Sequence, residues 1–212
     1  MERSETRAPG GPHPVPDLAS LDPGYDGYDA TTVPTRRWPR GSRPRMTSNR
    51  FSGDHCMLTI DIPGRNPLAL QNLVLDYNGT IACDGALLPG VAPAVEELRQ
   101  VLAVHVLTAD TFGSAGAQLA PLGVALALIP PGGQAEAKAA FVEKLGADTV
   151  VAIGNGANDA AMLARAALGI AVIEGEGAAG AALRAADVVV TDIRHAFDLL
   201  LKPLRLKATL RT

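Results

Sequence analysis

The chain has 212 residues, 47% of them hydrophobic and 4% aromatic, and its formal net charge is −3 at pH 7. A chain of this length buries one good core, so we expect a single folded domain. No apolar run reaches the roughly 18 residues that span a bilayer, and the N-terminus lacks a basic end followed by an apolar stretch, which argues against membrane insertion and export. Because Cys56 and Cys83 are too few for a disulfide framework, we expect a soluble, cytoplasmic protein.

Residues 1–50 differ from the rest because they are rich in Pro, Gly, Asp and Arg and show no periodicity. Such a segment buries too little apolar surface to offset the entropy lost on ordering, so we expect a disordered tail. The arginines around Trp38 are open to interpretation as a nucleic-acid patch, but a solvated tail is the simpler reading and no nucleic-acid partner is expected. Met46 is an alternative start of the protein.

From residue 57 to 212 the sequence alternates short apolar runs with alanine-rich stretches. Residues 57–62 alternate like a half-exposed strand, whereas 73–77 is continuously apolar, like a strand buried on both faces. The elements expected next, in chain order, are a helix over 93–102, a strand over 104–108, a helix over 114–119, a strand over 124–129, a helix over 134–145, a strand over 149–153, a helix over 158–167, a strand over 169–173, a helix over 180–186, a strand over 187–191 and a helix over 194–201. This alternation predicts an α/β fold with a doubly wound parallel sheet.

Polar residues gather where the predicted strands end, in "DYNGT" (76–80), "TAD" (108–110) and "GNGAND" (154–159). Ligands of such sheets bind outside the carboxyl ends of the strands, so these stretches are candidates for one site. A carboxylate at Asp76 suits a metal ligand or a nucleophile, although an Asp there also caps a turn. Thr108, with the amide of Ala109, suits phosphoryl oxygens, although a strand-end Thr also serves as a helix N-cap.

Two further features point to the same edge of the sheet. Lys138 lies near the start of the predicted helix over 134–145, whose beginning faces the carboxyl ends of the strands, whereas Lys144 lies about 9 Å further along the axis and is the poorer candidate. The glycines of "GNGAND" permit a tight turn before a helix N-terminus, which favours anions. Read singly, each feature also fits a solvated lysine or an ordinary capped turn.

Taken together, "DYNGT", "LTAD", Lys138 and "GNGANDAAML" resemble the motifs of the haloacid dehalogenase superfamily, in the same order, over residues 73 to about 192. In that family "DxDGT" carries the nucleophile, a strand-end Thr or Ser binds phosphate, a Lys neutralises charge and "GDGxND" holds magnesium. The stretch 166–192, "AALGIAVIEGEGAAGAALRAADVVVTD", further resembles the phosphorylation domain of P-type ATPases. The likeness is nearest to the small soluble proteins described as P-type ATPase-like.

The resemblance implies that Asp76 attacks phosphorus to form an aspartyl phosphate. Phosphate oxygens would be held by Asn78, Gly79, Thr108, Ala109 and Lys138. Mg²⁺ would be held by Asp76, the carbonyl of Asn78, Asn155 and Asp159.

Two departures from the family motifs weaken the expected activity. The residue that serves the family as general acid and base is Asn78 here, and an amide does neither job, so turnover should fall by about 10²–10⁴-fold unless the leaving group is good. Asn155 replaces a carboxylate of the magnesium loop, so metal affinity should fall, although Asp159 compensates in part by ligating the ion directly or through water.

The gaps between the motifs are too short for a cap domain, which usually needs about 50 residues, so we expect an open, capless site. Such a site suits a phosphorylated small molecule or nucleotide, or a macromolecular phospho-substrate, and a homo-oligomer is expected in which residues 199–212 form a covering arm. A receiver domain also uses an Asp, a Thr and a Lys, but it needs an earlier acidic pair where only Asp61 is found. The remaining alternative is a regulatory or phosphate-binding protein without turnover.

Overall fold

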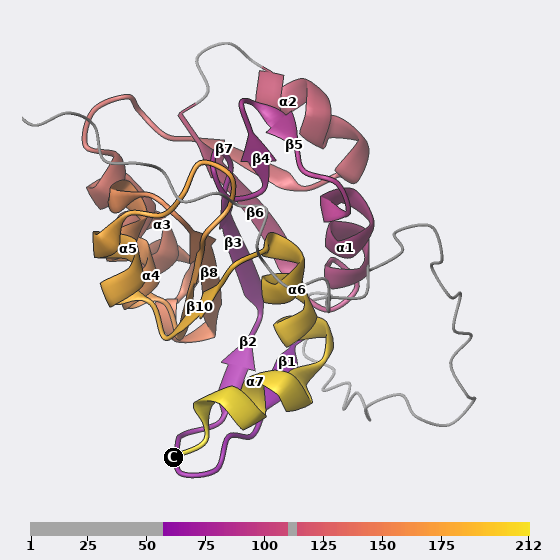
Figure 1. The fold of residues 1–212 in the computed structure, drawn as a ribbon, viewed down its shortest axis with the longest axis vertical. Coiled ribbons are helices and arrows are strands. Elements are labelled where there is room, and N and C mark those ends of the chain that lie inside the picture. The colour runs from indigo at the N-terminus through magenta and orange to yellow at the C-terminus, as the bar shows by residue number, and fades with distance from the viewer. Residues whose placement is uncertain (1–56, 110–113) are drawn as a thin grey trace, which may run out of the picture. The chain divides into compact units, whose positions relative to one another are not determined.

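The computed structural model describes residues 57–109 and 114–212 (Figure 1). Contacts divide the chain into Met1–Thr47 and Ser48–Thr212, and all described residues belong to the second unit. The predicted tail, the alternative start at Met46, Cys56 and Asp110 lie outside the described residues. None of the helices within 57–109 and 114–212 combines the length and apolar character that crossing a bilayer requires.

A parallel sheet of 6 strands forms the centre of the domain, in the order β10-β9-β8-β3-β6-β7. Its strands are β3 (Asn72–Asp76), β6 (Ala103–Thr108), β7 (Ala125–Leu128), β8 (Val150–Gly154), β9 (Leu168–Val172) and β10 (Val188–Val190). The order confirms the predicted α/β fold, because the chain runs from β3 outward to β7 and then from β8 outward to β10. The reversal of strand order between β3 and β8 is where such sheets bind ligands.

Helices cover both faces of this sheet (Figure 1). Helices α1 (Val91–Leu98) and α6 (Ile193–Leu201) pack on one face, and α3 (Gln134–Leu145), α4 (Ala160–Arg165) and α5 (Gly180–Ala185) pack on the other. The remaining helical segments are α2 (Ser114–Leu119), α7 (Pro203–Leu210) and the short 3₁₀ turns η2 (Ala120–Leu122), η3 (Ala147–Thr149) and η4 (Ala157–Asp159).

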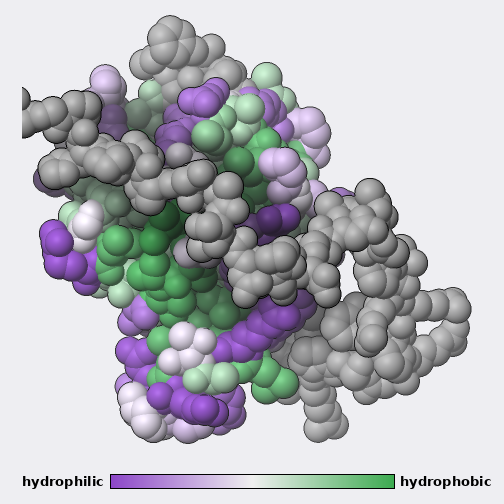
Figure 2. Space-filling model, viewed as in Figure 1, coloured by the Kyte–Doolittle hydropathy of each residue, from purple (hydrophilic) through white to green (hydrophobic). Residues whose placement is uncertain are grey.

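The continuous apolar run of β3 is explained by burial on both faces. Leu73 and Leu75 belong to the core beneath α1 and α6, whereas Val74 belongs to the core beneath α3 and α4. Since side chains alternate along a strand, a central parallel strand needs apolar residues at every position. Figure 2, in the same view, shows apolar surface between α5 and α6, over the edge strand β10, whose Val189 is 46% exposed.

Two small hairpins lie outside the main sheet and were not predicted. Strand β1 (Leu58–Ile60), expected over 57–62, pairs with β2 (Leu68–Leu70), and β4 (Ala82–Cys83) pairs with β5 (Ala86–Leu87). The tip of the second hairpin has two left-handed residues, Asp84 with φ 49° and Gly85 with φ 75°. Asp-Gly is the usual pair for such a two-residue turn, but strands of two residues are too short to show periodicity.

The segment 199–212, expected to form a covering arm in a homo-oligomer, packs on its own chain in this structure. These residues end α6 and form α7, which packs on its own chain beside the hairpin β1-β2. Thr212 N donates to the Pro63 carbonyl over 3.4 Å, and Lys207 lies 3.8 Å from Asp61. The hairpin directly precedes β3, so this contact lies at the amino edge of the sheet, opposite the candidate site.

Candidate active site

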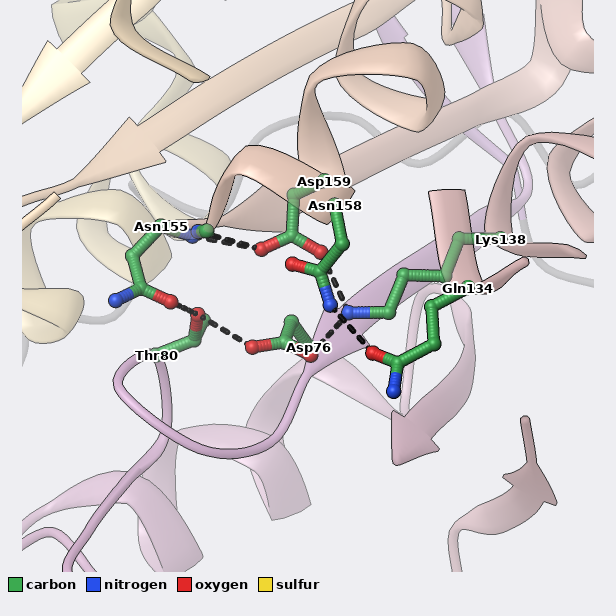
Figure 3. A network of polar contacts seen from close by, with 8 residues as sticks. Asp76, Thr80, Gln134, Lys138, Asn155, Asn158 and Asp159 are labelled. Carbon is green, nitrogen blue, oxygen red and sulfur yellow. Dashed lines mark hydrogen bonds and ion pairs between the residues drawn. The ribbon is translucent and has the colours of Figure 1, made fainter. Parts of the chain in front are cut away.

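The register of β3 and β8 brings two of the predicted stretches together. Leu75 pairs with Ile153, so Asp76 and Gly154 end their strands at the same level. The loop after β8 continues through η4 into α4, and α3 reaches the same edge with its first turns. Figure 3 shows the side chains that meet there from these elements.

A buried lysine joins two buried carboxylates at this edge. Lys138 Nζ donates to Asp76 Oδ1 over 2.5 Å and to Asp159 Oδ1 over 2.6 Å (Figure 3). The exposed fractions are 1% for Lys138, 8% for Asp76 and 0% for Asp159. Charges this deep are tolerated only when they are paired and hydrogen-bonded. When both carboxyl groups are ionised, they and the one ammonium leave one net negative charge in the cluster.

The electrostatics of the cluster favour an added positive charge. Burial, and then the negative charge of Asp159, raise the pKa of Asp76 from 3.8 to about 7, although Lys138 acts in the opposite direction. Burial lowers the pKa of Lys138, but the charges of Asp76 and Asp159 outweigh it and hold that pKa above its ordinary value. Lys138 therefore stays an ammonium at neutral pH, while Asp76 ionises fully only when its negative charge is better compensated.

Asp159 holds the loop as well as the lysine. Its Oδ2 accepts from the backbone N–H of Asn155 over 3.0 Å and of Gly156 over 2.8 Å, while its Oδ1 accepts from Lys138. Gly154 permits this close approach, because a Cβ there would lie 2.6 Å from the Asp159 carboxyl carbon. Both Asp159 oxygens are engaged by the protein, so Asp159 supports the loop and Lys138, and the metal role expected for it, direct or through water, stays a prediction.

Thr80 links the nucleophile candidate to the loop after β8 and was not singled out from the sequence. Its Oγ1 lies 3.2 Å from Asp76 Oδ2 and 3.2 Å from Asn155 Oδ1. A hydroxyl carries one proton, so it donates fully to only one of these two acceptors at a time. The place of Thr80 at the end of "DYNGT", four residues after Asp76, was the available signal.

The backbone after Asp76 turns sharply, and its contacts differ in part from the prediction. Gly79 has φ 74°, and a Cβ there would lie 2.3 Å from Asn155 Nδ2, so only glycine fits. Its N–H, expected to face phosphate, donates to the Ala82 carbonyl over 2.7 Å. Asn78 is exposed at this turn and forms an isolated bridge with Ala82.

The remaining predicted residues lie on neighbouring elements of the same edge. Thr108 is 2% exposed and ends β6, one residue beyond the Leu107 that pairs with Asp76. Ala109 follows it and is half-buried. Gln134, at the start of α3, was not predicted, and its Oε1 accepts from Asn158 Nδ2 over 2.7 Å, which ties this helix to the loop after β8.

The donor set fits a hard divalent cation. Asp76 Oδ2 and Asn155 Oδ1 are oxygen acceptors from two adjacent strand ends, and they converge on one hydroxyl that cannot satisfy both. Mg²⁺ prefers such oxygens and usually takes only one or two carboxylates from the protein. The net negative charge of the cluster and the raised pKa of Asp76 favour the same occupant.

Comparison with known proteins agrees with this arrangement. The family model described as haloacid dehalogenase-like hydrolase matches residues 42–167. An uncharacterised protein of Methanocaldococcus jannaschii is 53% identical over 62 residues, which are 29% of this chain and 67% of that protein. A structure assigned to the same hydrolase family, from Streptomyces avermitilis, superimposes with a TM-score of 0.52 at 21% identity, over 64% of this chain and 87% of that chain.

A phosphatase with a related fold is also found among solved structures. The 3-deoxy-D-manno-octulosonate 8-phosphate phosphatase of Moraxella catarrhalis, solved with magnesium and phosphate ions, matches with a TM-score of 0.51 at 17% identity, over 63% of this chain and 86% of that chain. P-type ATPases are among the similar structures too, as the resemblance implied, at TM-scores of 0.45 and 0.46. These scores are too low to place the chain nearer to the pumps than to the phosphatases.

Proposed function

Because the chain belongs to the family of haloacid dehalogenase-like hydrolases, we propose that it is a Mg²⁺-dependent phosphohydrolase whose nucleophile is Asp76. The observation that carries this proposal is the buried Lys138 ammonium, 2.5 Å from Asp76 and 2.6 Å from Asp159 at the ligand-binding edge of the sheet. A lysine held there neutralises negative charge that develops on a transferring phosphoryl group.

In the proposed reaction, a carboxylate oxygen of Asp76 forms a bond to phosphorus as the bond from phosphorus to the leaving oxygen breaks. Lys138 and the hydroxyl of Thr108, with the N–H of Ala109, steady the phosphoryl oxygens. A water molecule then attacks the phosphorus of the aspartyl phosphate, which releases phosphate and restores Asp76. Asp159 keeps Lys138 in place through both steps and fixes the loop after β8.

Asp76 and Asn155 would hold Mg²⁺ through their side-chain oxygens, with the carbonyl of Asn78 as a further donor. The bound ion would supply charge neutralisation for the phosphoryl group. Asp159, expected to ligate the ion directly or through water, also supports the site through Lys138 and the loop amides. Thr80, which contacts both Asp76 and Asn155, orients these two acceptors toward each other.

The exposed amide of Asn78 sets the limit on turnover. It neither protonates a leaving oxygen nor activates water, so both steps rely on solvent, and the rate should be about 10²–10⁴-fold below that of an enzyme with an acid at this position. Substrates with good leaving groups, such as acyl phosphates and nucleoside triphosphates, are least affected.

We further propose a phosphorylated small molecule or nucleotide as the substrate, because phosphatases that act on such a molecule share the fold and no separate cap encloses the described site. A macromolecular phospho-substrate is the second choice for an open site. The cytoplasmic location and the homo-oligomeric state expected from the sequence belong to the same proposal. The competing function, a regulatory phosphate-binding protein without turnover, is favoured by the neutral Asn78 and Asn155 alone.

The test is Mg²⁺-dependent release of phosphate from acetyl phosphate, p-nitrophenyl phosphate and ATP. We expect Asp76→Asn to abolish release and Asn78→Asp to raise it by about 10²-fold or more, because the latter restores an acid–base group. Asp148→Asn, at an exposed position on the opposite edge of the sheet, is the matched control.

Absence of turnover would contradict the proposal. If the wild type and Asn78→Asp both fail to release phosphate with Mg²⁺, the enzyme assignment fails. If Mg²⁺ raises the melting temperature nonetheless, the regulatory alternative is supported.

A further inference from the structure

The side chain of Asn155 makes a different contact with each of its two polar atoms. Its Oδ1 lies 3.2 Å from the Thr80 hydroxyl, and its Nδ2 donates to the Gly177 carbonyl over 2.9 Å. These partners fix the orientation of the amide, because a carbonyl accepts only from the N–H end and a hydroxyl donates to the oxygen end. A carboxylate at this position would have no N–H for Gly177.

The partner of this amide is a tight turn over residues 174–177. Gly177 N donates to the Glu174 carbonyl over 2.8 Å and closes the turn. Asn155 holds the segment a second time, because its carbonyl accepts from Ala179 N over 2.8 Å. The position of this turn therefore depends on the loop after β8.

The turn 174–177 also contacts the tip of the hairpin β4-β5. Glu176 Oε1 accepts from the backbone N–H of Asp84 over 2.9 Å. Cys83 Sγ lies against the turn, since a Cβ on Gly175 would be 3.5 Å from it. The hairpin is the next element after β3 in the chain and so borders the carboxyl edge of the sheet.

The other side of the hairpin is fixed by a helix. Gln118 of α2 accepts from Leu87 N over 2.8 Å and donates to the Gly85 carbonyl over 2.6 Å, and Tyr77 Oη donates to the same carbonyl over 3.1 Å. Gln118 and Tyr77 are independent of the loop after β8, and Thr80 contacts Asn155 before the hairpin begins, so the contact through Glu176 is the link between that loop and the tip of the hairpin.

We propose that Asn155 is a positioning residue that couples the loop 154–159, through the turn 174–177, to the hairpin β4-β5. Where the proposed function holds, this coupling fixes the hairpin beside a substrate bound at Asp76. The neutral amide then has a function of its own. Compared with a carboxylate, it lacks one negative charge at the cation site but supplies the N–H that holds the turn. Asn155→Asp would reverse both, adding charge beside Asp76 and placing an oxygen against the Gly177 carbonyl.

Cys83 reports on this coupling without any need for turnover. The sequence contains 2 cysteines, so a Cys56→Ser background leaves Cys83 as the sole thiol. The measurement is the rate of alkylation by iodoacetamide, a neutral reagent, at pH 9. We expect Asn155→Asp to raise this rate by about 2- to 10-fold, the effect of one lost hydrogen bond on opening of the hairpin. Desolvation, and then nearby negative charge, raise the pKa of the Cys83 thiol, so the added charge would slow the reaction and a faster rate reflects the lost contact.

Asn158→Asp is the matched control, because it makes the same change of charge in the same loop but removes the contact with Gln134 instead. Its alkylation rate should equal that of the Cys56→Ser parent. An unchanged rate in Asn155→Asp, or an equal rise in both variants, would overturn the proposal.

A second pair of variants tests the link at the hairpin itself and does not touch the loop after β8. Both Glu176→Ala and Glu176→Gln remove a negative charge near Cys83, but only Glu176→Ala also removes the acceptor of Asp84 N, so its Cys83 rate should exceed that of Glu176→Gln. Equal alkylation rates in these two variants would mean that the effect comes from the lost charge alone, which would contradict the coupling.

The kinetic readout separates this inference from the proposed function. In the active protein, Glu176→Ala should raise KM for p-nitrophenyl phosphate and leave kcat nearly unchanged, since it loosens the border of the site and not Asp76. If the wild type shows no turnover, the proposed function fails while the alkylation result stands. If turnover is present and the alkylation rates do not differ, the coupling fails alone.

Discussion

At the scale of single residues, the ammonium of Lys138 is the group whose loss should cost the fold most. Lys138→Met keeps the side-chain volume but leaves Asp76 and Asp159 buried without their shared cation. Removing one partner of a buried ion pair costs about 3–5 kcal/mol in the free energy of unfolding. Urea unfolding at pH 8 measures this change.

Lys144→Met provides the comparison, because Lys144 lies exposed on the same helix α3. An exposed substitution should change the free energy of unfolding by less than about 0.5 kcal/mol. If the free energy of unfolding falls by a similar amount in the two variants, the ion pairs of Lys138 with Asp76 and Asp159 do not account for the loss.

The sequence located the charged centre of the site better than its surroundings. Asp76 and Lys138 could be placed because a strand end and the first turn of a helix have fixed directions in a parallel sheet. The roles of Thr80 and Asn158 depend on how two loops turn after their strands, which the identity of neighbouring residues does not determine. The engagement of both Asp159 oxygens likewise becomes visible only when the loop amides are in place.

At the scale of elements, His105 of β6 connects the sheet to a helix. Its ring lies edge-on to Phe141 of α3 with 5.7 Å between centroids, and its Nε2 lies 3.1 Å from Asn72 Oδ1. Burial lowers the pKa of His105 below 6.5, so the folded protein favours the neutral ring. The unfolded chain therefore takes up the proton first, and stability present above pH 6.5 is lost as the pH falls through the folded pKa.

We expect His105→Gln to flatten the decline of stability between pH 7 and pH 5, measured as the urea midpoint at each pH. His195→Gln, at an exposed position of α6, controls for the loss of a histidine as such. If stability declines as steeply in His105→Gln as in the wild type, titratable groups other than His105 cause the decline.

Most elements could be predicted because their lengths exceed one turn or one strand repeat, and α3 was placed at its observed bounds. Differences arose at the ends. Helix α1 begins two residues before Pro93, since proline is tolerated in a first turn, and α4 begins late because the 3₁₀ turn η4 precedes it. The hairpin β4-β5 has strands of two residues that are fixed by Gln118 and Glu176, which are distant in sequence.

At the scale of the whole molecule, the two outermost strands of the central sheet, β10 and β7, differ in the charge of the residues around them. Strand β10 is flanked by Asp187 and Asp192, whereas the sequence has no charged residue from 111 to 135, around β7. Within the described part of the chain, β7 pairs with β6 alone, and its Leu128 is 69% exposed. An uncharged, apolar edge strand favours pairing with a second copy of itself.

We therefore expect Leu128→Lys to shift the protein toward monomer, measured by sedimentation velocity over a range of concentrations. Leu204→Lys is the control, because Leu204 is 81% exposed on α7, away from the sheet edge. If the wild type and both variants sediment identically, β7 takes no part in the self-association that the sequence predicts.

The contact between the hairpin β1-β2 and helix α7 has a consequence for how the protein is made. Ile62 and Leu68, from the first segments that the structure describes, line one small hollow together with Leu210. Leu206 of α7 is 0% exposed in the same core as Ile60. A nascent chain therefore holds these early apolar residues without their cover until residues 203–212 have emerged from the ribosome, so this part of the core closes only after helix α7 has been made.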